Sequence, residues 1–121
     1  MKIFCDFDGT ISHNDLLDII IKYVYGEDAL HKNQKELLEN KIEHNEQLYT
    51  IFKNIPLKLD EIIEIINKHE KNNVIDKYFN QFYDNVIENE CDFYIISGGF
   101  KQIIQNFLPC IDLNRIFAND F

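Results

Sequence analysis

The sequence of 121 residues has few cysteines, no long apolar run and a deficit of positive charge. The three cysteines, Cys5, Cys91 and Cys110, are widely spaced and include no Cys-X-X-Cys pair. An odd number of cysteines in this pattern argues against a disulfide framework and a structural zinc site, and it fits a reducing compartment. We therefore expect a cytoplasmic protein whose cysteines act as small apolar side chains near strand and helix ends.

The apolar runs are too short for a membrane-spanning helix, and the N-terminus lacks the apolar segment typical of a signal peptide. Lys and Arg number 12 and Asp and Glu number 21, so the formal net charge is -9 at pH 7. An acidic chain repels nucleic-acid backbones and anionic membrane surfaces, so we expect neither as a partner. An anionic substrate would need a local attraction, which a bound metal ion could supply.

Segments of strand and helix character alternate along the chain, without internal repeats or low-complexity tracts. Residues 2–7 and 93–96 are short apolar runs, and residues 114–120 are a third candidate strand. Continuous apolarity in residues 93–96 predicts a strand buried on both faces, as in a parallel sheet. Helical spacing predicts helices over residues 14–26, two between 29 and 54, and further helices over 59–70, 76–90 and 100–108. Strands that alternate with helices predict an α/β fold with three parallel strands.

The predicted helices at residues 59–70 and 76–90 have recognisable N-cap residues, and the second contains an aromatic cluster. Asp60 and Asp76 are typical residues for the N-caps of these helices. The aromatic cluster that follows Asp76 is expected in the core, because a stacking platform for nucleic acid would need basic neighbours. Its members are Tyr78, Phe79, Phe82 and Tyr83.

Two acids, Asp6 and Asp8, follow the first predicted strand one residue apart. Acidic residues are disfavoured in strands and costly to bury, so their position needs a reason. Taken alone, the pair fits an Asp-Gly turn, and Ser97 with Gly98 fits a strand-to-helix turn. However, ligands of parallel sheets collect at the carboxyl ends of the strands, where both stretches are predicted to lie. Together they favour one shared site.

The residue types at this expected site suit phosphoryl chemistry. Two nearby carboxylates repel each other, and Mg²⁺ relieves the repulsion because it prefers oxygen ligands and bridges to phosphate. One of Asp6 and Asp8 can act as a nucleophile, and the other as a general acid and base. Gly9 and Thr10 would offer backbone N–H groups and a hydroxyl to a phosphoryl group, and Ser97 with Gly98 would offer more.

The stretches DFDGT (residues 6–10) and IISGG (residues 95–99) resemble the haloacid dehalogenase (HAD) superfamily. Its first motif is DxDx[TV], and its second is a Ser or Thr at the end of the second core strand. Residues 4–15 and 75–100 resemble, more narrowly, the group that contains the phosphoserine phosphatases and the methionine-salvage phosphatases. The similarity runs over essentially the whole chain and is weaker in its middle segment.

The resemblance implies a truncated HAD-like core with a helical cap inserted after the first strand. Residues 1–12 and 73–121 would form the core, and residues 13–72 the cap. In the family the first strand is flanked by strands that come later in the sequence. Without them, residues 2–7 are expected at a sheet edge, where they would pair with a second copy or with a complementing C-terminal fragment.

The resemblance also assigns roles to four residues. Asp6 would be the nucleophile and a Mg²⁺ ligand, and Asp8 would be the general acid and base and bind the metal through its backbone carbonyl. Ser97 would hold the transferring phosphoryl group. Asp15 matches the cap-hinge acid with which phosphoserine phosphatases read their substrate. The implied function is a Mg²⁺-dependent phosphomonoesterase that acts on a small phosphorylated metabolite through an aspartyl-phosphate.

The sequence departs from the family pattern after the second motif. Family members carry a charge-balancing Lys in a third motif and a GDxxxD-like fourth motif that completes the metal site, and this sequence has neither. Lys101 is a poor substitute, because it is expected inside the helix that follows IISGG. Two alternatives to a phosphatase therefore stay open: an inactive protein that binds Mg²⁺ or phosphate, and a split protein that needs a complementing chain.

Overall fold

The computed structural model describes residues 1–39, 53, 55, 57–70 and 73–120. The chain divides into two compact units. Unit 1 contains Met1–Asp15 and His69–Phe121, and unit 2 contains Leu16–Lys68. The sequence predicts a core of residues 1–12 and 73–121 and a cap of residues 13–72, and the role of unit 2 as a cap stays a prediction.

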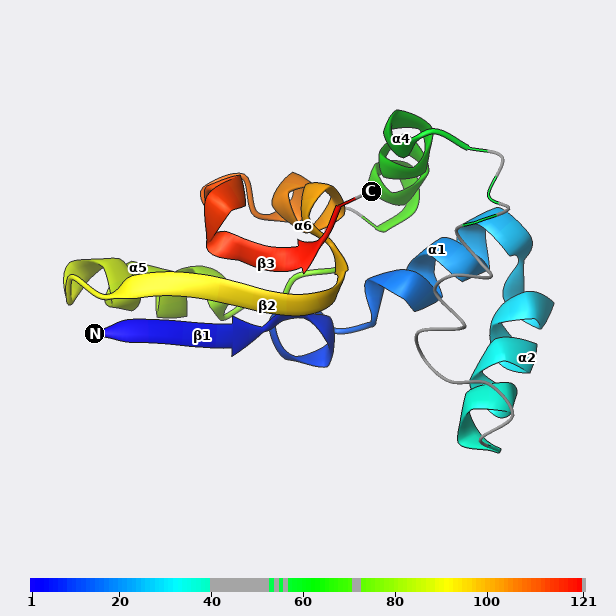
Figure 1. Ribbon diagram of the computed structural model, residues 1–121, viewed down its shortest axis with the longest axis horizontal. Helices are drawn as coiled ribbons and strands as arrows, with labels where there is room; N and C mark the ends of the chain where they lie inside the picture. Colours follow the sequence, from blue (N-terminus) through cyan, green and yellow to red (C-terminus); the bar gives the residue numbers. More distant parts are fainter. Residues whose placement is uncertain (40–52, 54, 56, 71–72, 121) are drawn as a thin grey trace. The chain divides into compact units, whose positions relative to one another are not determined.

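Unit 1 contains a parallel sheet of three strands, drawn blue, yellow and red in Figure 1: β1 (Lys2–Asp6), β2 (Asp92–Phe100) and β3 (Ile116–Asn119). Their spatial order is β1-β2-β3. β1 pairs with β2 from Lys2 opposite Asp92 to Asp6 opposite Ile96. The predicted α/β fold with three parallel strands is confirmed. Within the described residues β1 lies at an edge of the sheet, also as predicted.

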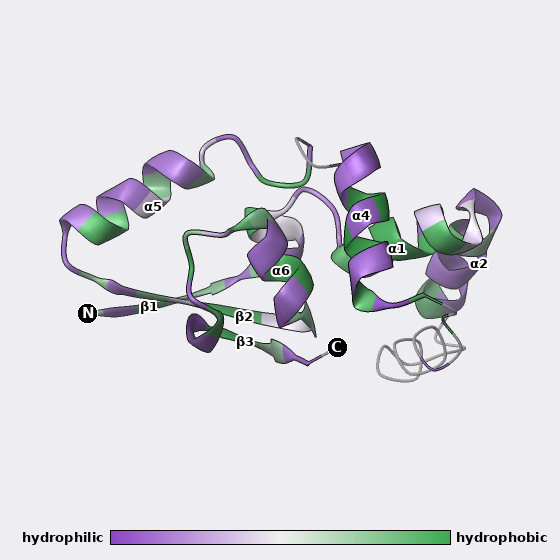
Figure 2. Cartoon of the chain, turned by 90° about the horizontal axis from the view of Figure 1, so that it is seen from above, coloured by the Kyte–Doolittle hydropathy of each residue, from purple (hydrophilic) through white to green (hydrophobic). Residues whose placement is uncertain are grey.

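Two helices of unit 1, α5 (Phe79–Glu88) and α6 (Lys101–Phe107), lie on the same side of this sheet (Figure 2). The core of unit 1 forms on that side, because every second strand residue points toward the helices. Phe93 and Ile95 of β2 are buried there, and the Phe79 ring lies 6.1 Å from the Phe93 ring. Burial of each such side chain contributes about 1.5–3 kcal/mol to folding.

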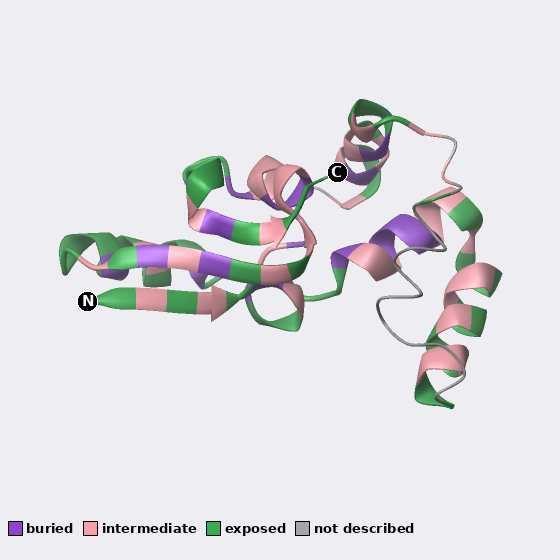
Figure 3. Cartoon of the chain, in the orientation of Figure 1, coloured by how far each residue is buried: buried purple, intermediate pink, exposed green. Residues whose placement is uncertain are grey.

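The opposite face of the sheet carries exposed apolar side chains, which corrects the expectation of burial on both faces. Phe4 is 55% exposed, Ile96 50% and Phe117 53%. Figure 3 shows the buried bands of β2 separated from one another and flanked by half-buried or exposed ones. Continuous apolarity was a misleading signal here, because no helix of unit 1 within the described residues covers this second face.

The expectations for the helix near residues 76–90 also need correction. Tyr78 is 63% and Phe82 44% exposed, so only part of the aromatic cluster is core. The helix begins at Phe79, and the Asp76 carboxylate accepts a hydrogen bond from the Tyr78 N–H at 2.8 Å in the preceding turn. Asp60 is not an N-cap either, since it lies inside the first turn of α4 (Leu59–Glu70).

Unit 2 contains α1 (Leu16–Tyr25), α2 (Glu27–Leu38) and most of α4. Gly26 separates the first two helices with a φ of +100°, and its N–H reaches the carbonyls of Ile21 and Lys22 at 3.1 Å. Of the two helices predicted between residues 29 and 54, the second lies outside the described residues. No helix in the described part of the chain is long and apolar enough to span a membrane.

Candidate active site

The loop after β1, Phe7–Ile11, forms a single turn that the Ser12 N–H closes with a hydrogen bond to the Phe7 carbonyl at 3.0 Å. Gly9 adopts a φ of +76°, a left-handed conformation that glycine tolerates better than other residues. Phe7 is fully buried and Ile11 is 3% exposed, so both ends of the loop are fixed by packing. Asp6, Asp8 and Thr10 stay on the accessible side of the loop.

Ser12 fixes the base of this loop, although no motif in the sequence identifies it as a functional residue. It is 1% exposed, and its hydroxyl lies 2.9 Å from the Asn14 carbonyl oxygen and 3.2 Å from that of Phe7. The Gly9 N–H donates to the Ser12 Oγ at 3.3 Å. A buried hydroxyl with several partners holds a loop more firmly than packing alone.

The loop is also tied to the segment before α5. The His13 N–H donates to the Val74 carbonyl at 2.9 Å, and the Asp76 N–H donates to the Ile11 carbonyl at 2.8 Å. These bonds flank an antiparallel bridge between Ser12 and Ile75. The loop Phe7–Ile11 is therefore bonded both to Ser12 at its base and to the segment before α5, all within unit 1.

The two predicted motifs meet in the structure. The Ser97 hydroxyl donates a hydrogen bond to Asp8 Oδ2 at 2.9 Å. The Gly99 N–H donates to Ser97 Oγ at 2.9 Å and so orients the hydroxyl. A Cβ on Gly99 would lie 3.3 Å from Ser97 Oγ and 3.9 Å from Asp8 Oδ2. The second glycine of IISGG therefore permits the close approach of the two motifs.

Asp6 lies at the carboxyl end of β1, in register with Ile96, the residue before Ser97. Its Oδ2 accepts a hydrogen bond from Thr10 Oγ1 at 3.3 Å. Both side chains are exposed, so an incoming ligand can reach them. The parallel register thus places the first acid beside the IISGG stretch of β2. The sequence predicts that these two stretches share one site.

Other predicted residues have different surroundings. The Gly98 carbonyl accepts a hydrogen bond from Asn119 Nδ2 at 3.0 Å, which ties the second motif to the end of β3. Apart from its place at the end of the third strand, no signal in the sequence identifies Asn119 as part of this site. Asp15 is exposed and directly precedes α1, and its role in reading a substrate stays a prediction.

Lys101 is the first residue of α6, directly after β2. Its Nζ lies 3.5 Å from Asp120 Oδ2, and Gln102 Nε2 donates to Asp120 Oδ1 at 3.1 Å. The ammonium group therefore already has a carboxylate partner. This contact gives no support to Lys101 as the cation that balances a nucleophile and a phosphate.

The oxygen atoms of Asp6 and Asp8 are donors that suit Mg²⁺. This ion is commonly held by one or two carboxylates together with waters and substrate phosphates. Within the described residues, no group of three or more His, Cys, Asp or Glu side chains could hold a metal ion. The donor set of this part of the chain therefore fits a Mg²⁺ ion that shares a phosphate ligand better than an all-protein metal cage.

The Cys5 thiol is next to Asp6, at the start of the acidic loop, and is partly buried. Burial, and then the negative charge of Asp6, raise the pKa of Cys5 above its ordinary value. The cysteines Cys5, Cys91 and Cys110 are all free.

An acidic loop follows β1 of the parallel α/β sheet and is hydrogen-bonded to Ser97 of β2, which is the arrangement that the resemblance to HAD-like phosphatases implies. The chain is similar to proteins of this kind. It is 33% identical over 123 residues to proteins named 2-hydroxy-3-keto-5-methylthiopentenyl-1-phosphate phosphatase from Bacillus thuringiensis (strain Al Hakam) and Bacillus cereus (strain AH187). These alignments cover 99% of this chain and 54% of each relative. The chain thus spans about half the length of the curated relatives it matches. No family model matches the sequence.

Solved structures share the fold. A phosphoserine phosphohydrolase-like protein from Francisella tularensis subsp. tularensis SCHU S4 matches with a TM-score of 0.73 and 22% identity, covering 98% of this chain and 58% of that one. A phosphoserine phosphatase in the form of a phospho-aspartyl intermediate analogue matches with a TM-score of 0.70 and 20% identity, covering 97% and 55%. At these identities the matches establish similarity of fold alone.

Proposed function

We propose that the chain carries the part of a HAD-type phosphohydrolase that contains the nucleophile. The activity would be that of a Mg²⁺-dependent phosphomonoesterase that acts on a small phosphorylated metabolite. The observation that carries the proposal is the hydrogen bond from Ser97 to Asp8, which joins two motifs 89 residues apart. The relatives at 33% identity, whose names are those of a phosphatase, support it.

In the proposed reaction, a carboxylate oxygen of Asp6 attacks the phosphorus of a phosphomonoester. A bond forms between Asp6 and phosphorus, the ester P–O bond breaks, and protonated Asp8 gives its proton to the leaving alcohol. The Asp8 carboxylate then takes a proton from water, the water oxygen attacks phosphorus, and inorganic phosphate leaves with Asp6 restored. Thr10, beside Asp6, and Ser97, beside Asp8, would orient the two carboxylates.

Asp6 and Asp8 would hold Mg²⁺, which supplies charge neutralisation between the carboxylates and a phosphoryl group when bound. The residues of the chain then bind and orient the phosphoryl group. Electrostatic stabilisation of this kind is commonly the largest contribution to phosphoryl transfer.

The proposal is tested by hydrolysis of an aryl phosphate with and without Mg²⁺. We expect turnover that needs Mg²⁺ and that is abolished by Asp6→Asn, which keeps the shape of the side chain but removes the nucleophile. Turnover that persists in Asp6→Asn would contradict the assignment. The phosphate ester in the names of the relatives is the first natural substrate to test.

A second candidate function is Mg²⁺ or phosphate binding without turnover. Two observations favour it: Lys101 is paired with Asp120, and Asp6 and Asp8 belong to no larger acidic cluster within the described residues. Isothermal titration with Mg²⁺ and inorganic phosphate separates the two functions. Binding that Asp6→Asn and Asp8→Asn both weaken, without hydrolysis under any condition, would identify the binding function.

A further inference from the structure

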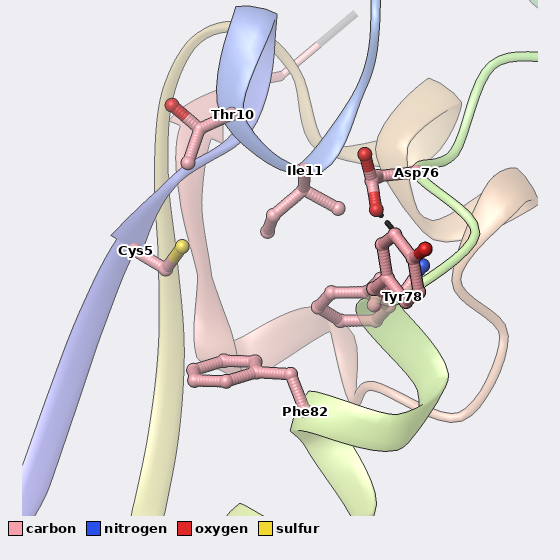
Figure 4. A pocket seen from close by; sticks show the side chains of 7 residues that line it. Cys5, Thr10, Ile11, Asp76, Tyr78 and Phe82 are labelled. Carbon is pink, nitrogen blue, oxygen red and sulfur yellow. Dashed lines mark hydrogen bonds between the residues drawn. The ribbon is translucent and has the colours of Figure 1, made fainter.

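An apolar pocket of about 250 Å³ borders the loop after β1, with Cys5, Ile11 and Phe82 among its lining residues (Figure 4). Neither Asp8 nor Ser97, the pair that joins the two motifs, lines this pocket. Polar contacts, and not the shape of the pocket, therefore orient these two side chains.

The residues Ser97–Gly99 leave the regular ladder of the sheet. The pairing of β1 with β2 reaches only as far as Ile96. Between the pairs Ile96–Phe117 and Phe100–Asn119, β2 advances by four residues while β3 advances by two. Within the described sheet the register thus gives Ser97–Gly99 no strand partner, as in a bulge, and ladder hydrogen bonds do not fix this stretch.

Two side chains hold the peptide between Gly98 and Gly99 instead. Its carbonyl accepts a hydrogen bond from Asn119 Nδ2 at 3.0 Å, and its N–H donates to Ser97 Oγ at 2.9 Å. In a planar trans peptide the carbonyl and the N–H point in opposite directions, so a bond that fixes one of them also fixes the other. Because glycine on both sides gives this peptide little steric resistance to rotation, the two side-chain bonds set its orientation.

Asn119 is thereby connected to Asp8 through three consecutive hydrogen bonds, the last of which runs from Ser97 Oγ to Asp8 Oδ2 at 2.9 Å. We propose that Asn119 is a positioning residue of this site: it orients the Gly98–Gly99 peptide, whose N–H holds the Ser97 hydroxyl in place to donate to Asp8. The effect of Asn119 on turnover rests on the proposed phosphohydrolase function, whereas its effect on the peptide does not.

The end of β3 has a second attachment that does not involve the Asn119 side chain. The carboxylate of Asp120 accepts a hydrogen bond from Gln102 Nε2 at 3.1 Å and lies 3.5 Å from Lys101 Nζ, both at the start of α6. Loss of the Asn119 amide therefore leaves this end of the strand anchored. Its effect should be local, at the Gly98–Gly99 peptide, and should not be a detachment of β3.

Amide hydrogen exchange, measured by NMR on the chain without substrate, tests the local effect. In Asn119→Ala and in Asn119→Asp, which keeps the shape but not the donor, the Gly99 N–H should exchange about threefold to tenfold faster, the range for loss of one neutral hydrogen bond. Ile95, in the middle of β2, should keep its exchange rate. The matched control is Asn114→Ala, at an exposed asparagine in the turn Leu113–Arg115, which should change neither rate. An unchanged rate at Gly99 in both Asn119 variants, or an equal rise at Ile95, would overturn the proposal.

A double-mutant cycle with Ser97→Ala tests the effect on turnover. Because Asn119 acts through Ser97, Asn119→Ala should lower Mg²⁺-dependent aryl phosphate hydrolysis about threefold to tenfold in the otherwise unchanged protein, and by less than about twofold in the Ser97→Ala background. Equal losses in the two backgrounds would show that Asn119 acts independently of Ser97 and would overturn its positioning role. Absence of turnover in the unchanged protein would count against the phosphohydrolase function alone, because the exchange rates at Gly99 are measured without substrate and still decide the role of Asn119.

Discussion

Ser97 and Asp8, 89 residues apart in sequence, share a hydrogen bond of 2.9 Å between Ser97 Oγ and Asp8 Oδ2. The bond exists because parallel pairing of β1 and β2 places Asp6, the last residue of β1, opposite Ile96, the residue before Ser97. The Gly99 N–H donates a hydrogen bond to Ser97 Oγ and so orients the hydroxyl toward Asp8. This contact is the structural basis for treating two distant motifs as one site.

The first prediction concerns Ser97 itself. Ser97→Ala removes the donor to Asp8, and we expect Mg²⁺-dependent aryl phosphate hydrolysis to fall by about 10- to 100-fold, the range for loss of a hydrogen bond to a charged group. Ser97→Thr keeps the hydroxyl and should retain most of the activity. Equal rates for the Ala variant and the unchanged protein would show that the bond has no catalytic part.

Gly9 and Gly99 are predicted to respond differently to alanine. At Gly9 a Cβ meets nothing within 4 Å, but the φ of +76° makes Gly9→Ala cost about 1 kcal/mol of unfolding free energy. At Gly99 the φ is ordinary and the Cβ crowds Ser97 Oγ, so Gly99→Ala should lower activity with a smaller change in stability. Urea denaturation and hydrolysis rates of both variants distinguish the two effects, and identical profiles would contradict this division.

Ser12 is predicted to stabilise the loop and not to take part in chemistry. Ser12→Ala leaves buried backbone groups with fewer partners and should lower the unfolding free energy by about 1–3 kcal/mol. The matched control is Thr10→Ala, which removes an exposed hydroxyl and should change stability by less than about 0.5 kcal/mol. Chemical denaturation of both variants measures the difference. A larger loss in Thr10→Ala than in Ser12→Ala would reverse the two assignments.

The raised pKa of Cys5 predicts a pH dependence for its alkylation. The thiolate is the reactive form, so the folded protein should reach half-maximal alkylation at Cys5 at a higher pH than the urea-unfolded chain. Asp6→Asn removes the secondary cause and should move this pH downward, while burial keeps it above the unfolded value. Below the ordinary pKa of a thiol, Cys5 is protonated in both the folded and the unfolded states. Above that pKa the unfolded state loses the proton first, so the free energy of unfolding falls as the pH rises further. Peptide mass spectrometry of iodoacetamide-treated samples measures the profile, and an upward move in Asp6→Asn would contradict the electrostatic cause.

The sequence predicted the sheet and the site because their signals are local. Asp6, Asp8 and Ser97 stand at the ends of short apolar runs, and parallel pairing requires such ends to meet. The exposed face was not predictable, since the apolar run at residues 93–96 reads the same whether one or both faces are covered. Likewise, the bond from Asn119 to Gly98 depends on the irregular register between β2 and β3, which no local pattern indicates. The exposure of Tyr78 and Phe82 was not predictable either, because helical spacing does not show which part of a helix its neighbours leave uncovered.

If Asp6 is the nucleophile of a phosphoryl-transfer site, it carries a covalent phosphoryl group during turnover. Mass spectrometry of the protein, quenched in acid during incubation with an aryl phosphate and Mg²⁺, detects this group. We expect one added phosphoryl group on the peptide that contains Asp6, and none in Asp6→Asn. A phosphoryl group on another residue, or no phosphoryl group on the unchanged protein, would contradict this role of Asp6.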